Sequence, residues 1–359
     1  MPPVRLAIVG VTALVGRDLR PLHDATVVIE DEHVETVGPR RQVSVPEGAE
    51  VMDGVGLTLA PGFIDAHVHI GFARPHDVVA GGVTTVRDLG WPAARIFELA
   101  SRSREPDFDG PTVLAAGPIL TAPGGYPARA AWAPHGTALE IETEHDAASA
   151  VEDMAEAGAC VIKVALNPPA GPALETSLLK AIVGAAHACA LRVTAHVFGL
   201  RELDKALRAG VDELAHMLLG PDVLPMETIA RMVDANMVVV PTLGIFPRSS
   251  RELAIQGLRR FLDAGGRAVY GTDLGNDGPR PGIDPVEVQA LIAAGMNPAE
   301  VIAAATVTAA EILGLENSGV LQPGAVADLV AFHGDALHDY NALTRVVRVW
   351  RRGNPVRMP

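Results

Sequence analysis

The feature that most constrains the fold of this chain is a long alternation of two kinds of segment. Between residues 57 and 318, short apolar runs rich in β-branched residues alternate with stretches rich in Ala, Leu and Glu. The apolar runs predict eight strands, at Phe63–Ile70, Thr84–Leu89, Thr112–Ala116, Cys160–Ala165, Arg192–His196, Glu213–His216, Met237–Pro241 and Ala268–Thr272. Helices are expected between them, among others at Ala147–Ala157, Thr176–Ala190, Leu200–Ala209 and Met226–Ala235. Eight strands that each lead into a helix predict an α/β fold, a (β/α)8 TIM barrel.

Both ends of the chain have a different pattern. Residues 1–56 and residues 319–359 contain short alternating runs and no stretch that predicts a long helix. The runs lie at Leu6–Val9, Ala25–Glu30, Val34–Val37, Ala327–Phe332 and Arg345–Arg351. We therefore expect three segments: 1–56 and 319–359 form one small β-sandwich domain, and 57–318 forms the barrel.

Composition excludes several classes of protein. Hydrophobic residues make up 48% of the chain and charged residues 20%, which is typical of a globular protein with a large core. The formal charge of −14 argues against nucleic-acid or anionic-membrane partners, because no basic surplus is available to neutralise phosphates. Two cysteines, Cys160 and Cys189, lie in apolar surroundings and predict free thiols in a reducing cytoplasm. The sequence predicts neither a signal peptide nor a membrane helix.

The first expected barrel strand contains the strongest chemical signal, His67-Val68-His69. Side chains at positions i and i+2 of a strand project from the same face, so the two imidazoles lie together. At the end of a strand they form half of a site for a divalent metal of the zinc type. Two core histidines bonded to the backbone are the alternative.

Lysine is scarce in this chain, and one of its three lysines lies inside an apolar strand. Lys180 and Lys205 lie in expected helices, whereas Lys163 follows Val161 and Ile162. Burying an unpaired ammonium costs several kcal/mol, so the side chain either reaches the surface or is chemically altered. A buried neutral amine can react with CO2 to form a carbamate, an anionic ligand that bridges two cations. The nearby histidines favour the carbamate.

Three more candidate ligands end apolar runs. His196 and His216 close successive expected strands, and Asp273 follows the last one. Barrel enzymes keep their site residues at these strand ends. In this interpretation Asp273 ligates a metal and accepts the proton of the attacking water; the alternative for Asp273 is a turn or helix N-cap.

His135, in the Gly- and Pro-containing stretch 117–136, is a candidate substrate contact. The aromatic content of 4% suggests aliphatic rather than aromatic cavity walls.

Together these residues resemble the amidohydrolase superfamily, specifically its binuclear members with a carboxylated lysine. The runs Gly82-Val83-Thr84-Thr85-Val86-Arg87-Asp88, Ile162-Lys163-Val164 and Ala195-His196-Val197-Phe198-Gly199, with the closing segment 319–330, are most similar to the branch of prolidases and imidazolonepropionases. The resemblance implies that His67, His69 and Asp273 hold one metal, that His196 and His216 hold the other, and that Lys163 bridges them. Prolidase-like members carry Gly-Gly-His where this chain has Gly124-Gly125-Tyr126, which leaves dipeptide specificity open and makes Tyr126 a candidate substrate contact.

The implied activity is hydrolysis of an amide or other C–N bond of a small molecule by a hydroxide that bridges two divalent ions, most simply Zn²⁺. Dipeptides and N-acyl amino acids are candidate substrates, and a homo-oligomer is possible in principle. A mononuclear deaminase or an imidazolonepropionase-like cyclic amidohydrolase would need one metal and give Lys163 no role. A non-catalytic barrel acting as an interaction scaffold would be expected to have lost ligands. An NAD-linked dehydrogenase is suggested by the glycine-containing run 7–16, but no helix and second parallel strand follow.

Overall fold

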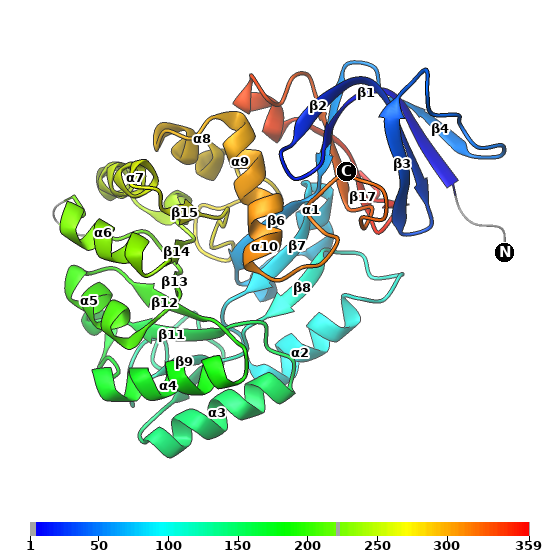
Figure 1. The fold of residues 1–359 in the computed structure, drawn as a ribbon. Coiled ribbons are helices and arrows are strands. Elements are labelled where there is room, and N and C mark those ends of the chain that lie inside the picture. Colours follow the sequence, from blue (N-terminus) through cyan, green and yellow to red (C-terminus); the bar gives the residue numbers. More distant parts are fainter. Residues whose placement is uncertain (1–4, 220–222, 359) are drawn as a thin grey trace.

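Eight parallel strands form the barrel in the computed structural model, which describes residues 5–219 and 223–358 (Figure 1). The strands are β6 (Phe63–Val68), β7 (Val83–Asp88), β8 (Thr112–Ala115), β11 (Ile162–Leu166), β12 (Val193–Val197), β13 (Glu213–Leu214), β14 (Val238–Val239) and β15 (Arg267–Ala268). β6, β7 and β8 pair in parallel, as do β11 to β15 in chain order.

Backbone hydrogen bonds close these two groups of strands into one barrel. The Cys160 N–H donates to the Ala115 carbonyl at 2.9 Å and so joins β8 to the start of β11. On the other side, the Ala66 N–H donates to Tyr270 at 3.0 Å and the Asp273 N–H to His67 at 2.7 Å. The first strand is thereby tied to the segment after the last, as a (β/α)8 barrel requires.

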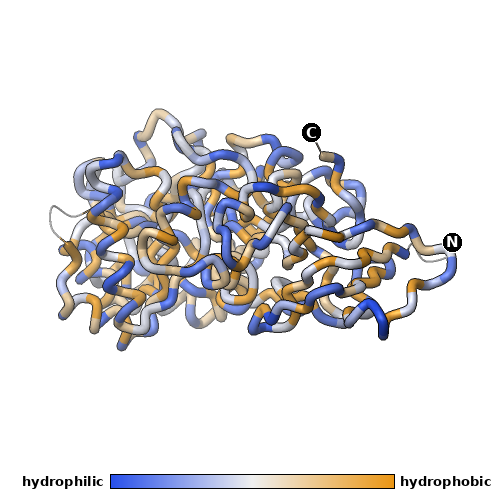
Figure 2. The backbone as a smooth tube through the Cα atoms, turned by 90° about the horizontal axis from the view of Figure 1, so that it is seen from above, coloured by the Kyte–Doolittle hydropathy of each residue, from blue (hydrophilic) through white to orange (hydrophobic). Residues whose placement is uncertain are grey.

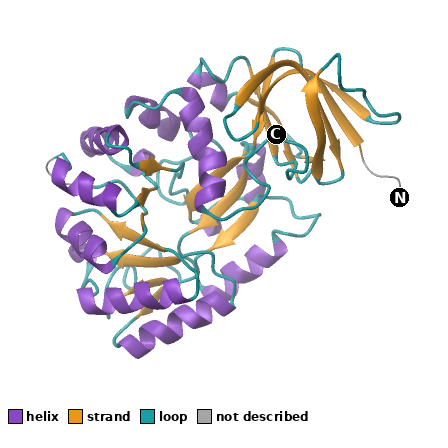
Figure 3. Ribbon diagram, in the orientation of Figure 1, coloured by secondary structure: helices purple, strands orange, loops and turns teal. Residues whose placement is uncertain are grey.

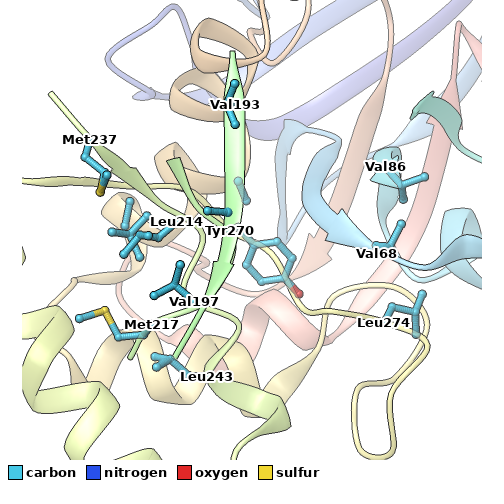
Figure 4. Packing of buried hydrophobic residues seen from close by; sticks show 14 of the residues in the cluster. Val68, Val86, Val193, Val197, Leu214, Met217, Met237, Leu243, Tyr270 and Leu274 are labelled. Atoms are coloured by element: carbon cyan, nitrogen blue, oxygen red, sulfur yellow. The ribbon is translucent and has the colours of Figure 1, made fainter. Parts of the chain in front are cut away.

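Helices surround this barrel on the outside, as Figure 3 shows. They are α1 (Pro75–Ala80), α2 (Ala93–Arg102), α3 (Glu144–Glu156), α4 (Thr176–Ala188), α5 (Leu200–Ala209), α6 (Met226–Asp234), α7 (Arg248–Asp263), α8 (Pro285–Ala293), α9 (Pro298–Ala305) and α10 (Val307–Ile312). The packing follows the 3.6-residue period: in α5, Leu203, Ala206 and Ala209 are buried on one face. Figure 4 shows part of the resulting interior, in which Val193, Leu214, Met217, Leu243 and Tyr270 belong to one buried cluster.

The α/β barrel expected from the alternation is confirmed, with differences in detail. Helix α5 has the expected bounds, whereas β13, β14 and β15 are only two residues long. Two short strands in the long excursion after β8 were not expected: β9 (Ile119–Thr121) pairs with β11 and with β10 (Ala138–Glu140). These strands place the excursion against the barrel rim.

A second sheet lies beside the barrel and is built from both ends of the chain (Figure 1). Its strands are β1 (Arg5–Val15), β2 (Arg20–Glu30), β3 (His33–Pro39), β4 (Glu50–Asp53), β5 (Leu57–Pro61), β16 (Leu329–His333), β17 (Val346–Arg351) and β18 (Asn354–Pro355). β16 pairs with β5, which brings the two ends together, and the strands enclose a core of their own. The small β-domain expected from the two ends of the chain is therefore confirmed, and its strands are joined by hydrogen bonds in one continuous order.

This sheet also accounts for the glycine-containing run near the start of the chain. The run lies within β1 and its following turn, and β1 pairs with β2 antiparallel. A dinucleotide-binding unit needs a helix after its first strand and a second parallel strand, so the run is not such a turn. β5 belongs to this sheet, although residue 57 was expected to begin the barrel; the division at 56/57 and 318/319 into domains stays a prediction.

The hydropathy of the chain follows this arrangement, because short hydrophobic segments alternate with hydrophilic ones throughout both parts (Figure 2). Within residues 5–219 and 223–358, no helix has both the length and the apolar character to cross a membrane.

Candidate metal centre

The six predicted ligands meet at one rim of the barrel. His67 lies in β6, Lys163 in β11 and His196 in β12, whereas His69, His216 and Asp273 lie one to five residues beyond the ends of β6, β13 and β15. All six side chains are buried, and all six line one cavity. The ends of parallel strands meet at one rim of a barrel, so residues spread from 67 to 273 become neighbours.

Three of these residues form a compact group that could hold a metal ion: His67, His69 and Asp273. The Asp273 Oδ1 atom lies 3.3 Å from His67 Nε2 and 3.4 Å from His69 Nε2. On the opposite side of each ring, Nδ1 donates to a backbone carbonyl, of Ala215 at 2.7 Å and of Gly90 at 3.1 Å. These bonds leave the Nε2 lone pairs directed at Asp273, the arrangement that metal-binding histidines adopt.

The chemistry of this group fits a cation. Neither the His67 Nε2 atom nor the Asp273 Oδ1 atom has a hydrogen-bond partner among the described residues, although both are fully buried. Buried polar atoms without partners are rare because each costs free energy. A divalent cation between the nitrogen and the oxygen would satisfy both.

The other two histidines form a second pair of donors. His216 Nε2 lies 3.0 Å from His196 Nδ1. The remaining nitrogen of each ring has its own contact: His216 Nδ1 lies 2.8 Å from Thr242 Oγ1, and His196 Nε2 lies 3.3 Å from Asn167 Nδ2. Two ring nitrogens that face each other, each ring held from its far side, can share a cation.

Lys163 lines the same cavity as these two groups. Its side chain is 1% exposed, and its Nζ atom has no hydrogen-bond partner among the described residues. Its charge acts on all four histidines and on Asp273. Burial lowers the pKa of the Lys163 amine to about 7, against an opposing effect of Asp273 and Glu213. A substantial fraction of the amine is therefore neutral and nucleophilic near neutral pH.

Burial also sets the protonation of the other ligands. It is the largest cause of the lowered pKa of each imidazole, to about 4 for His69 and well below the usual value for His67, His196 and His216. The imidazoles are therefore neutral, which is the form that binds metals. Burial raises the pKa of Asp273 to about 7, so this carboxylate can take up and release a proton near neutral pH.

A buried carboxylate holds the two ends of the first group together. Asp65 accepts hydrogen bonds from the Thr272 hydroxyl at 2.6 Å and from the Thr272 N–H and His67 N–H at 3.1 Å each. Asp273 itself adopts a left-handed backbone with φ of 56°, which is uncommon for a residue with a side chain. Asp65 therefore fixes the strained turn that carries Asp273 against the strand that carries His67.

The cavity above these residues has a volume of about 330 Å³. Its walls are Phe72, Ile119, Tyr126, Trp132, Phe198 and Ile245, so they are largely aromatic, contrary to the expectation from composition. Tyr126 lines the cavity as expected, and its ring stacks on His196 with centroids 4.7 Å apart. His135, by contrast, is exposed and is not among the residues that line the cavity. Sequence reasoning missed Trp132, which follows Tyr126 without any periodic pattern.

Comparisons with known proteins agree with this geometry. Residues 58–356 match the model of the amidohydrolase family. An uncharacterized protein of Mycobacterium tuberculosis is 31% identical over 80% of this chain and 82% of its own. The imidazolonepropionase of Deinococcus deserti is 27% identical over 95% of this chain and 94% of its own. A prolidase structure in complex with N-methylphosphonate-L-proline has the same fold, with a TM-score of 0.81, 24% identity and coverage of 99% of this chain and 100% of that one.

The chain therefore belongs to the amidohydrolase family. Within it, the chain is similar in sequence to an imidazolonepropionase and in fold to a prolidase. The protein is an enzyme that acts on C–N bonds. Its buried His67, His69 and Asp273 could bind the metal that such enzymes commonly use, and related enzymes act on small molecules.

Proposed function

We propose that the protein hydrolyses an amide or related C–N bond of a small molecule at a centre of two divalent cations, most simply Zn²⁺, bridged by a carbamate on Lys163. The observation that carries the proposal is the Lys163 amine, which is buried without a hydrogen-bond partner among the described residues and lines the same cavity as both groups of donors. His67, His69 and Asp273 would hold one cation, and His196 and His216 the other.

Charge balance supports the carbamate. In its formation, the lone pair of Lys163 Nζ attacks the carbon of CO2, the new N–C bond places charge on oxygen, and the nitrogen releases a proton to solvent. The neutral amine becomes an anion with two oxygen donors, and one more proton is released where the lysine starts as the ammonium cation. A cation at Lys163 would repel both metal ions, whereas an anion attracts both. A single ion at His67, His69 and Asp273 would leave Lys163 without a role.

Bound divalent cations lower the pKa of water from 15.7 toward about 7 and polarise a substrate carbonyl. Asp273 would take the proton of the attacking water and return it to the leaving amine. Its Oδ1 atom lies near the Nε2 atoms of His67 and His69, and its Oδ2 atom, 3.8 Å from His216 Nδ1, would hold that proton. The Tyr126 hydroxyl would donate a hydrogen bond to the substrate oxygen; burial, with Asp273, raises its pKa to about 12, so it stays protonated during turnover.

Metal analysis of the purified protein with and without bicarbonate tests the proposal. We expect two zinc ions per chain in the wild type with bicarbonate, and a carbamate carbon resonance after labelling with ¹³C-bicarbonate. Lys163→Ala should lose that resonance and at least one ion, and its kcat/KM should fall about 10³-fold, or about 4 kcal/mol. Lys180→Ala is the matched control, since Lys180 is exposed on α4.

One ion per chain, indifferent to bicarbonate and to Lys163→Ala, would contradict the binuclear proposal and favour a mononuclear deaminase or cyclic amidohydrolase. A full complement of metal without hydrolysis of any amide would instead argue for a barrel that serves as an interaction scaffold.

A further inference from the structure

We propose that the substrate is a small amide that carries an aromatic group and has no carboxylate at the end facing solvent. This inference rests on the hydrolysis proposed above. Two features of the cavity lead to this class: its walls are aromatic, and its mouth carries a negative charge without a compensating cation.

The cavity walls are far richer in aromatic residues than the chain as a whole. Four of the 16 residues that line the cavity are aromatic, against 4% of the sequence. Phe72, Trp132 and Tyr126 follow one another around the mouth, with ring centroids 6.2 Å apart for the first pair and 6.1 Å for the second. Phe72 is 46% exposed although it is a large apolar side chain. Aromatic rings gathered around a cavity, one of them exposed, favour flat apolar groups.

The size of the cavity limits the substrate to a small molecule. About 330 Å³ is near the lower end of the roughly 300–1,000 Å³ typical of ligand sites. The amide must also reach the metal ligands at the floor. One aromatic ring with a short chain on either side of the C–N bond suits this volume.

The charges of the lining argue against a substrate carboxylate. Among the described lining residues, the one charged side chain outside the metal centre is Asp277, which is exposed four residues after Asp273. Sites that bind a substrate carboxylate use Arg, Lys or a protonated His to pair with it. Here the other polar groups of the lining are neutral amides, Asn167 and Asn276. The net charge of −14 adds a long-range repulsion of anions.

Arg251, which follows the turn that carries Ile245, does not supply the missing cation. Arg251 bonds the carbonyls of Gly244 and Phe246 at 2.9 and 2.8 Å, so its guanidinium closes the loop that carries Ile245. Dipeptides and N-acyl amino acids, suggested by the sequence resemblance, both bear a carboxylate beside the scissile amide. The cavity therefore favours neutral or cationic amides over these two classes.

Three matched substrates test the proposal on the metal-loaded enzyme: phenylacetylglycinamide, phenylacetylglycine and N-(2-aminoethyl)phenylacetamide. They share the scissile amide and differ in the charge of the leaving amine. We expect kcat/KM to be at least about tenfold higher for the neutral and cationic amides than for the acid. Asp277→Asn should narrow this gap and Asp277→Lys should reverse it, whereas Asp153→Asn, at an exposed position on α3, should leave it unchanged.

The aromatic contribution is measured with acetylglycinamide, which lacks the ring. We expect the phenylacetyl compound to be preferred about tenfold, and Trp132→Ala to abolish the preference while metal content stays at the wild-type value. Binding is measured in parallel by ligand-observed NMR.

The outcomes separate the two proposals. If the amides bind with the expected order but are not cleaved, the proposed hydrolysis fails and the substrate class stands. If phenylacetylglycine is cleaved and bound best, the substrate class is wrong and the hydrolysis stands. Absence of both binding and cleavage of all phenylacetyl compounds would overturn the substrate class as well.

Discussion

At the scale of single residues, the site depends on side chains that are costly to bury. Lys163 and Asp273 lie in an interior that opposes their charged forms, and both have a pKa shifted to about 7 by burial. The histidine ligands are held in place by hydrogen bonds on the side of the ring away from Asp273. The carbonyl of Ala215 accepts from His67 Nδ1, and the carbonyl of Gly90 accepts from His69 Nδ1. A pre-aligned set of donors binds a cation without first reorganising.

Replacing Tyr126 with Phe tests whether its hydroxyl acts in the transition state. We expect kcat to fall about 10²-fold, because loss of one donor to a developing oxyanion costs this much in other hydrolases. KM and metal content should change little, since the ring and its stacking on His196 remain. Steady-state kinetics with metal analysis gives both values; an unchanged kcat would remove Tyr126 from the catalytic step.

The position of most residues of the centre could be predicted from sequence for a physical reason. His69, His196, His216 and Asp273 lie at or just after the ends of apolar runs, and the ends of parallel strands meet at one rim whatever the details of the loops. Lys163, inside its strand, stood out as a buried charge instead. Trp132 and the exposed position of His135 were not predictable, because the stretch 117–137 has no periodicity and its path is set by contacts with the barrel. The aromatic walls were missed because overall composition averages over the whole chain.

At the scale of elements, the short strands β13 to β15 depend on contacts made by the loops that follow them. The η3 turn (Leu243–Ile245), which follows β14, is held by Glu287 of α8, whose Oε2 accepts a hydrogen bond from the Gly244 N–H at 2.7 Å. In the small β-domain, β1 is long enough to pair with β4 along its first half and with β5 along its second, so one strand joins both pairings.

Glu287 makes the stability of this element depend on pH. Burial raises its pKa from 4.5 to about 8, with Asp284 and Asp65 as further negative neighbours. The folded state therefore holds a proton that the unfolded state has released, so the free energy of unfolding falls as pH rises from about 4.5 to about 8. Glu287→Gln keeps an acceptor for Gly244 but cannot ionise.

Chemical denaturation at pH 5 and pH 9 measures this effect. We expect Glu287→Gln to gain stability relative to the wild type at pH 9 by a few kcal/mol, since one pKa unit corresponds to about 1.4 kcal/mol. Near pH 5 the two proteins should differ much less. An equal difference at both pH values would show that Glu287 does not titrate in this range.

At the scale of the whole molecule, the barrel must close between its first and last β/α units. Gly81, at the end of α1, and Gly282, in the loop after β15, meet at this seam. A Cβ atom on Gly282 would lie 2.4 Å from the Gly81 Cα atom, and Gly282 has a φ of +87°. Neither the space nor the backbone conformation accepts a larger residue.

Gly282→Ala should therefore destabilise the protein by about 2–4 kcal/mol. Gly184→Ala is the matched control, because Gly184 lies within α4 with nothing within 4 Å of the added Cβ atom. That variant should gain about 0.5–1 kcal/mol from helix propensity. Thermal unfolding of both variants measures the difference, and we expect the lower melting temperature for Gly282→Ala. Equal melting temperatures would contradict close packing between Gly81 and Gly282.

A metal-loaded crystal, measured at the zinc absorption edge, tests the central claim most directly. We predict two anomalous peaks. One should be bonded to His67, His69 and Asp273 and the other to His196 and His216, and density for a carbamate should continue from Lys163 Nζ to both metal ions. A single peak beside an unmodified Lys163 amine would contradict it.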